Sequence, residues 1–166
     1  MPRQRGGRHA GSDRRLGQQR PQAGARQAAA RTTPGRRHPA APAPGSPAEE
    51  AIVAAFVRAW ESADLDALVA LLTDDVFISM PPMPYEYTGR DLAARFCAGL
   101  FGAGRRYTLV RTRANGQLAF GAYLHGPSGV RQAMGLLVLG LAGERVQAIT
   151  RFERGVLPWF GLPASL

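Results

Sequence analysis

The residues of this chain best suited to acid–base chemistry are Glu153 and His125, because a general base is most often a His, Glu or Asp held in a cavity. His125 precedes a Gly-Pro pair, which is typical of a turn residue. Glu153 stands beside Arg154, so it can face solvent or pair with an arginine. Asp74-Asp75 follows a predicted helix end and is expected to terminate that helix. We therefore assign no catalytic residue, and the sequence favours a non-enzymatic role over an enzyme.

Motifs for other kinds of chemistry are missing from the sequence. It contains no Ser-His-Asp set, no phosphate-binding loop and no cluster with metal-ligand spacing. The single Cys97 excludes an internal disulfide and a Cys-based zinc site, so we expect no cofactor and no metal. No apolar run reaches the length of a membrane span, and no apolar segment follows the N-terminal charges as it would in a secretory signal. The expected location is the cytoplasm, without membrane contact.

The positive charge of the chain is confined to its beginning. Residues 1–48 contain ten Arg and a single acidic residue, whereas residues 49–166 contain eleven Arg and eleven Asp or Glu. Residues 1–45 have no aromatic residue, Ile or Val to bury, so we expect a disordered tail. This tail is either a solvated segment, an arm that neutralises nucleic-acid phosphates, or an out-of-frame translation. The remainder carries no net charge, and nucleic-acid binding by it is not expected.

A loop rich in Met, Pro and Tyr is the first candidate for a binding surface. Met80, Pro82, Tyr85 and Tyr87 lie in the segment Met-Pro-Pro-Met-Pro-Tyr-Glu-Tyr. Its prolines make it stiff, and its methionines can fill irregular gaps. Two interpretations stay open. The loop is a lid that plugs the open end of the fold, or it is a ligand or partner surface in which Tyr supplies rigid area and a hydroxyl.

Two further segments are candidates for a partner contact. Around the Asn-Gly turn, Arg113, Asn115 and Gln117 form either a polar patch against a partner domain or the solvated face of a hairpin, with Arg111 on the face of Arg113. Near the C-terminus, Trp159 and Phe160 lie between two prolines, so they cannot belong to a strand interior. We expect these aromatic residues to dock on the domain itself, on a neighbour or on a second copy in a homodimer.

The element pattern of residues 46–166 predicts an α+β domain in which helices pack on a curved, mostly antiparallel sheet. Three helices are expected, each opened by a capping residue, namely Ser46, Asp64 and Asp91. The first is the strongest, because Ser46, Pro47 and Glu49 have the spacing of a capping box. One strand is expected around Val76–Ile78. Four later strands are expected at residues 105–114, 117–125, 130–141 and 145–154.

The order of these motifs over about residues 48–166 resembles one known domain. The motifs are Leu-Val-Arg-Thr-Arg-Ala-Asn-Gly-Gln at 109–117, Ser-Met-Pro-Pro-Met-Pro-Tyr at 79–85, Gly-Arg-Asp at 89–91 and Leu-Pro-Trp-Phe-Gly-Leu-Pro at 157–163. They are similar to the C-terminal SnoaL-like domain of extracytoplasmic-function (ECF) RNA polymerase sigma factors, a branch of the nuclear-transport-factor-2-like superfamily. The resemblance implies a cone-shaped fold of three helices on a curved sheet.

The resemblance also implies a function. It predicts a regulatory or ligand-sensing domain that modulates transcription initiation, contacts the sigma core regions and takes a small apolar ligand in its cone. The chain carries no legible promoter-binding helices. The alternative is a stand-alone SnoaL-like small-molecule binder, or an enzyme resembling a cyclase or isomerase.

Overall fold

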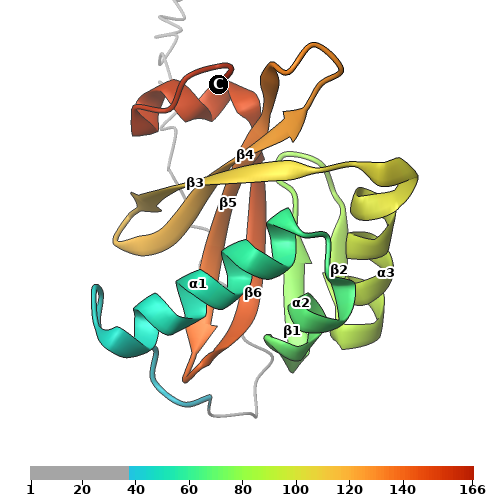
Figure 1. Ribbon diagram of the computed structural model, residues 1–166. Helices are drawn as coiled ribbons and strands as arrows, with labels where there is room; N and C mark the ends of the chain where they lie inside the picture. The colour runs from blue at the N-terminus through green and yellow to red at the C-terminus, as the bar shows by residue number, and fades with distance from the viewer. Residues whose placement is uncertain (1–37) are drawn as a thin grey trace, which may run out of the picture.

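The computed structural model describes residues 38–166, so most of the predicted tail lies outside the described residues. The predicted order of two helices, a strand, a third helix and four further strands is present, and three α-helices accompany a six-stranded sheet (Figure 1). The expected α+β fold class is confirmed. The helices are α1 (Pro47–Glu61), α2 (Leu65–Ala70), α3 (Arg90–Phe101), η1 (Gly102–Gly104) and η2 (Arg154–Phe160). The strands are β1 (Leu72–Ser79), β2 (Glu86–Thr88), β3 (Tyr107–Ala114), β4 (Gln117–His125), β5 (Arg131–Ala142) and β6 (Arg145–Glu153).

The first two helices begin where their capping residues predict, but the third does not: α3 begins at Arg90 after Gly89, and Asp91 lies inside its first turn without capping it. The Ser46 hydroxyl accepts a hydrogen bond from the Glu49 N–H at 3.2 Å, and Pro47 opens α1. The Glu49 carboxylate reaches back to the Gly45 N–H at 2.7 Å, so the capping box extends one residue before the N-cap. The Asp64 carboxylate accepts from the Ala67 N–H at 3.0 Å and starts α2 in the same way.

The strand order of the sheet is β2-β1-β6-β5-β4-β3. All neighbours are antiparallel except β1 and β6, which are parallel. One expectation was wrong here, and one strand was not predicted. Asp74-Asp75 does not terminate a helix but lies inside β1, where the ladder to β6 is interrupted between Leu72 and Phe77. The short strand β2 was not foreseen, because its three residues carry no periodic signal of their own.

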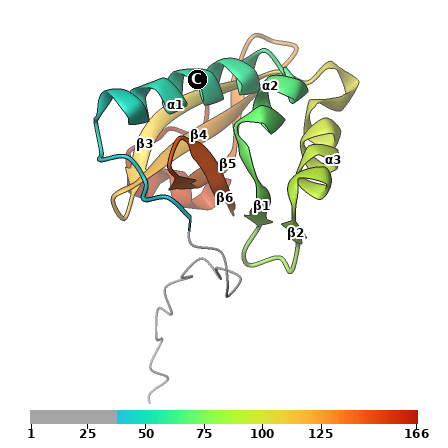
Figure 2. The ribbon, with the colours of Figure 1, turned by 90° about the horizontal axis from the view of Figure 1, so that it is seen from below.

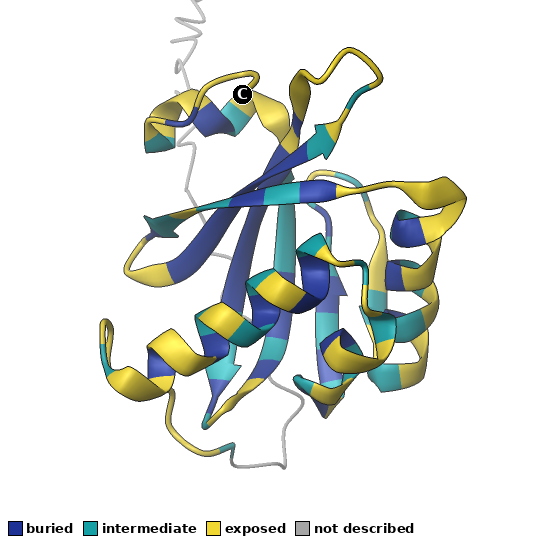
Figure 3. Cartoon of the chain, viewed as in Figure 1, coloured by how far each residue is buried: buried dark blue, intermediate teal, exposed yellow. Residues whose placement is uncertain are grey.

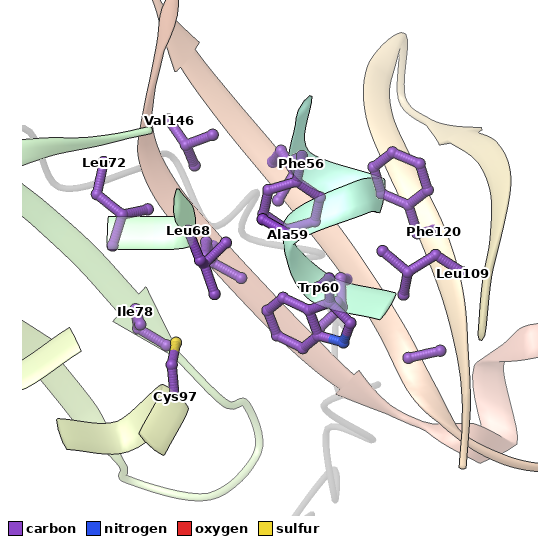
Figure 4. Packing of buried hydrophobic residues seen from close by; sticks show 14 of the residues in the cluster. Phe56, Ala59, Trp60, Leu68, Leu72, Ile78, Cys97, Leu109, Phe120 and Val146 are labelled. Atoms are coloured by element: carbon purple, nitrogen blue, oxygen red, sulfur yellow. The ribbon is translucent and has the colours of Figure 1, made fainter. Parts of the chain in front are cut away.

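Helix α1 crosses one face of the sheet and buries a row of large side chains against it (Figures 3 and 4). Phe56 stacks between Trp60 and Phe120, with ring centroids 5.5 and 5.6 Å apart. Trp60 in turn meets the edges of Phe101 and Tyr107. Aromatic pairs at these separations stabilise a core beyond their buried area. This cluster joins α1, α3 and β4 into one packed unit.

The opposite face of the sheet is covered in part by the C-terminal segment. Leu157 of η2 and Leu162 are buried there against a second apolar cluster on β4 and β5. Beyond η2, Ser165 pairs with Gln132, so the chain end continues the sheet along β5 where β6 has stopped. The aromatic tail thus docks on its own domain, but through leucines rather than through Trp159.

Residues 38–45, which composition assigned to the tail, lie against the domain. The Gly143 N–H at the β5–β6 turn donates to the carbonyls of Pro39 and Ala40 at 3.2 and 3.1 Å. The His38 ring lies 2.9 Å from Asp75 of β1. Figure 2 shows this segment passing from the start of α1 round the end of the sheet towards its far face.

Candidate functional site

The interior between α1, α3 and the sheet, where a cone-shaped fold would hold a ligand, is almost completely filled. It retains a cavity of about 40 Å³ between Trp60, Tyr107 and the side chains of α3. Ligand pockets are typically about 300–1,000 Å³. The described residues that line the cavity include no Asp, Glu or His. Neither the space nor an acid–base pair for proton transfer is therefore available there.

A much larger space lies on the opposite face of the sheet, and we call it the back groove. Its volume is about 730 Å³. Its floor is made of side chains that alternate with the buried core residues of the same strands: Phe77 and Ser79 of β1, Ala148 and Thr150 of β6, and Val138 of β5. One wall is the β1–β2 loop, with Met80, Pro81, Pro82 and Met83. The other is the N-terminal segment, with Ala41, Pro42 and Pro44.

The polar groups of the back groove are few, and most of them can both donate and accept hydrogen bonds. The hydroxyls of Ser79 and Thr150 lie 3.4 Å apart on the floor. Gln117 and Gln147 contribute amides, and Glu86 of β2 contributes an exposed carboxylate. The described residues that line the groove include no Arg, Lys or His. The groove therefore fits a mainly apolar molecule or chain segment with a few hydrogen-bonding groups.

At one rim of the groove, Glu49 joins α1 to β3 through two arginines. Its carboxylate is 2.5 Å from the Arg113 guanidinium and 3.2 Å from that of Arg111. Arg111 also binds Glu50 in bidentate fashion, with both distances 2.7 Å. The hydrogen bond from Arg113 lowers the pKa of Glu49 below its ordinary value, although desolvation opposes this. Glu49 is thus a charged carboxylate with only 3% of its surface exposed.

Both walls of the groove are held by backbone contacts. The N-terminal wall is fixed at one end by Gly143 and at the other by the hydrogen bond from the Gly45 N–H to Glu49. The β1–β2 loop is closed by a hydrogen bond from the Met80 N–H to the Tyr85 carbonyl at 3.2 Å. The groove therefore exists before anything binds, which lowers the entropic cost of binding.

The structure brings some of the predicted binding residues together and separates others. Met80, Pro82 and Gln117 all line the back groove, so the loop is not a lid on the cone interior. Arg113 lies next to it and is engaged by Glu49. Asn115 has a positive φ of 50° in the hairpin turn, as a two-residue turn requires.

The predicted aromatic residues do not converge on the groove. Tyr85 is exposed, and Tyr87 stacks on Phe96 of α3 with ring centroids 5.0 Å apart. Trp159 is 82% exposed, while Phe160 packs beside the second apolar cluster. The loop and the C-terminal tail therefore do not form one surface through these side chains.

Several groove residues were not identified from the sequence. Thr150 and Ala148 looked like ordinary strand residues, and Pro42 and Pro44 were assigned to the tail. Glu49 was recognised only as part of a capping box, although its pairing with two arginines across the fold ties the groove rim together. Strand alternation gives the face of Thr150, but only the path of residues 38–46 makes that face part of a groove.

The remaining chemical candidates do not form a site. His125 ends β4 and its ring lies 2.7 Å from the Thr108 hydroxyl, while Glu153 is exposed at the end of β6. Within residues 38–166, no group of three or more His, Cys, Asp or Glu is placed to hold a metal ion. No helix in the described part of the chain is long and apolar enough to cross a membrane.

Comparison with known proteins gives a consistent family. Residues 53–155 match the SnoaL-like domain family. The ECF RNA polymerase sigma factor SigG of Mycobacterium tuberculosis is 33% identical over 125 residues, which cover 72% of this chain and 33% of that protein. The chain therefore spans about a third of the length of the curated relatives it matches.

Two solved structures share the fold. An NTF-2 like protein of unknown function from Burkholderia xenovorans LB400 has a TM-score of 0.53 and 16% identity, covering 64% of this chain and 82% of that chain. A putative ketosteroid isomerase from Kribbella flavida DSM 17836 has a TM-score of 0.51 and 21% identity, covering 64% of this chain and 77% of that chain. At these identities the likeness shows the fold alone.

Proposed function

This chain belongs to the SnoaL-like domain family, and from that premise we propose that it is a regulatory domain of the ECF sigma-factor type, which modulates transcription initiation without catalysis. One observation carries the proposal. The matched region of SigG comprises only a third of that sigma factor, yet it accounts for 72% of this chain. The folded part of this chain therefore corresponds to an accessory domain of a sigma factor, and its proposed partners are sigma core regions and, through them, RNA polymerase. A protein with these partners works in the cytoplasm.

The filled interior supports a non-catalytic role. A cavity of about 40 Å³ holds little more than one water molecule, whose share of liquid volume is about 30 Å³. The alternative function, a stand-alone enzyme resembling a cyclase or isomerase, needs an interior base next to its substrate. Among the described residues, the titratable ones that line the cavity are Cys97, Tyr107 and Arg151. Burial raises the pKa of the Cys97 thiol to about 12, so this thiol is not a base near neutral pH.

The back groove is the proposed recognition surface of the domain. It has the volume of a ligand site, walls held by hydrogen bonds and a mainly apolar lining with a few hydrogen-bonding groups. A small apolar molecule with a hydrogen-bond donor, or an extended segment of the sigma core, would fit this chemistry. Either occupant would contact the β1–β2 loop and the N-terminal wall together. Binding in the groove would therefore depend on the position of the segment that precedes α1.

A binding experiment tests the proposal. The fluorescently labelled chain is titrated with SigG from which the region matched by this chain has been removed, and anisotropy is recorded. We expect saturable binding with a Kd in the micromolar range, as for contacts between domains of modest area. The variant Met83→Asp, which places a charge in the groove wall, should weaken binding at least tenfold. The matched variant Leu92→Asp, on the exposed side of α3, should bind like the parent. Absence of binding at about 100 μM truncated SigG, well above the expected Kd, or equal effects of the two variants, would contradict the proposal.

The enzyme alternative has its own test. Steroid and polyketide substrates bearing acidic C–H bonds are incubated with the chain, and product is quantified. We expect no turnover above the buffer rate. A robust activity abolished by Glu153→Gln or His125→Ala would support the alternative instead.

A further inference from the structure

The fold gathers unpaired arginines at one end of the sheet, although residues 49–166 carry no net charge. Three segments carry them: the α3–β3 connection, the β4–β5 loop and η2 with the chain end, which lie side by side across the upper half of Figure 1, with η2 on the left and the α3–β3 connection on the right. We call this surface the arginine end. It consists of Arg105, Arg106, Arg131, Arg151 and Arg154.

Strand pairing shows that these arginines are neighbours. The His125 N–H donates to the Arg106 carbonyl at 2.9 Å, and His125 is also the register partner of Arg131. Arg106 and Arg131 therefore lie on either side of His125. Each is one strand spacing from it, which is about 4.8 Å in a sheet. The Arg151 guanidinium donates to the carbonyl of Met134, near the start of β5. Arg154 follows directly after β6 and opens η2.

The charge of the arginine end is not neutralised by the described residues. None of its five arginines forms an ion pair with them, whereas Arg90, Arg111 and Arg113 do. The negative groups at this end are the exposed Glu153 and the carboxylate of Leu166. The arginine end thus carries five positive charges and two negative ones. We did not expect residues 49–166 to bind nucleic acid because their net charge is zero. A net charge does not show that the positive groups lie at one end of the domain.

An exposed aromatic side chain belongs to the same end. Trp159 lies on η2, the helix that Arg154 opens, and is 82% exposed. Arg105, Arg106, Arg131 and Arg154 are also exposed. The core of a protein–protein interface needs a buried apolar patch, and a single exposed indole does not provide one. Exposed arginines and an exposed indole at one end of a domain are instead a combination that suits single-stranded nucleic acid, because guanidinium groups bind phosphates and an aromatic ring stacks on an unpaired base.

We propose that the arginine end binds single-stranded DNA, with the arginines on the phosphates and Trp159 stacked on one base. In a duplex the bases stack on each other, so no base is free to stack on this indole. The site goes beyond the proposed regulatory role, since it requires neither a sigma factor nor the back groove. Failure of one proposal therefore leaves the other standing.

The test measures how salt weakens DNA binding by the full chain. A labelled single strand of 20 nucleotides is titrated by fluorescence anisotropy at several KCl concentrations. Each phosphate contact contributes about 0.7 to the slope of log K against log salt for a single strand. The triple variant of Arg106, Arg131 and Arg154 to Ala should lower this slope by about 2. The triple variant of Arg58, Arg95 and Arg145 to Ala, which removes equal charge elsewhere, should leave it unchanged. The N-terminal arginines contribute equally to all of these proteins.

Trp159→Ala tests the stacking contact separately. It should weaken binding to the strand about tenfold without changing the slope, while duplex binding stays the same. Equal slopes for the two triple variants would overturn the proposal, as would unchanged strand binding by Trp159→Ala. A selective loss of binding to a polyglutamate peptide in the first triple variant, with DNA binding intact, would show that the partner is an acidic protein. Melting temperatures within about 2 °C of the parent establish that the exposed substitutions preserve the fold.

Discussion

Replacing Glu49 by Ala should destabilise the domain far more than replacing its neighbour Glu50. The Glu49 carboxylate accepts hydrogen bonds from Arg113, Arg111 and the Gly45 N–H, and it is almost fully buried. A hydrogen bond to a charged group contributes about 1.5–3 kcal/mol, and a buried ion pair broken on one side costs about 3–5 kcal/mol. Both guanidinium groups are about one-third exposed and can rehydrate, so the lower part of this range applies.

We therefore expect Glu49→Ala to lower the free energy of unfolding by about 2–3 kcal/mol. At about 4 °C per kcal/mol for a domain of this size, the melting temperature should fall by about 8–12 °C. Glu50→Ala is the matched control. Its side chain is half exposed, and exposed ion pairs contribute little to stability, so the melting temperature of this variant should fall by less than about 4 °C.

The pH dependence provides a second check on Glu49. Its pKa in the folded chain lies below the ordinary value of 4.5, chiefly because Arg113 donates a hydrogen bond to it. The ionised carboxylate therefore stabilises the fold fully at pH values above 4.5, and this contribution is lost as the pH falls through the folded pKa. The difference in stability between the parent and Glu49→Ala, followed by urea unfolding, should be constant from pH 7 to 5.5 and narrow below pH 4.5. Equal melting of the Glu49 and Glu50 variants, or a difference that persists undiminished at pH 3, would refute this account of the Arg111–Arg113 cluster.

Three other predictions follow from burial and from the N-terminal wall. Cys97 is fully buried with a pKa of about 12, so a thiol reagent at pH 8 should modify it only at the rate of unfolding; rapid reaction of the native protein would contradict its burial. Trp159→Ala should change the stability by less than about 0.5 kcal/mol, whereas Leu157→Ala should cost about 2–5 kcal/mol in urea unfolding; the reverse order would mean that the indole docks on the domain. Deleting residues 1–37 should shift the melting temperature by no more than about 2 °C, while deleting residues 1–45 should lower it further, since this removes the hydrogen bonds to Gly143, Asp75 and Glu49; equal melting of the two truncated chains would count against the wall.

Much of the fold could be predicted because its signals are local. Ser46 and Asp64 cap helices through contacts with residues three positions ahead, and the Asn-Gly turn fixes the β3–β4 hairpin within two residues. Alternation also placed Arg111 and Arg113 on one face, where both meet Glu49. Asp74-Asp75 was misread because β1 pairs with β6 on both sides of these residues, at Leu72 and from Phe77 onward, which carries them inside the strand although Asp is usually depleted in strands.

The candidate sites depend on contacts between distant segments, which local signals do not contain. The back groove needs the β1–β2 loop and residues 41–44 on the same face of the sheet. The arginine end depends on the starts of β3 and β5 and the end of β6 lying at the same end of the sheet. Composition alone did not indicate it, because the charges of residues 49–166 sum to zero. Trp159 was expected to dock because large aromatic residues are usually buried, whereas Leu157 and Leu162 anchor this tail instead.

Transcription by a chimera tests the central claim most directly. The region of SigG matched by this chain is replaced with residues 38–166, and promoter-specific transcript from M. tuberculosis RNA polymerase is quantified against intact SigG and against SigG lacking that region. If the domain is regulatory, the chimera should differ from the truncated factor at least threefold in the direction of intact SigG, and Met83→Asp in the groove wall should abolish this difference while Leu92→Asp preserves it. Transcript levels equal to those of the truncated factor, for the chimera and both variants, would contradict a regulatory role for this domain.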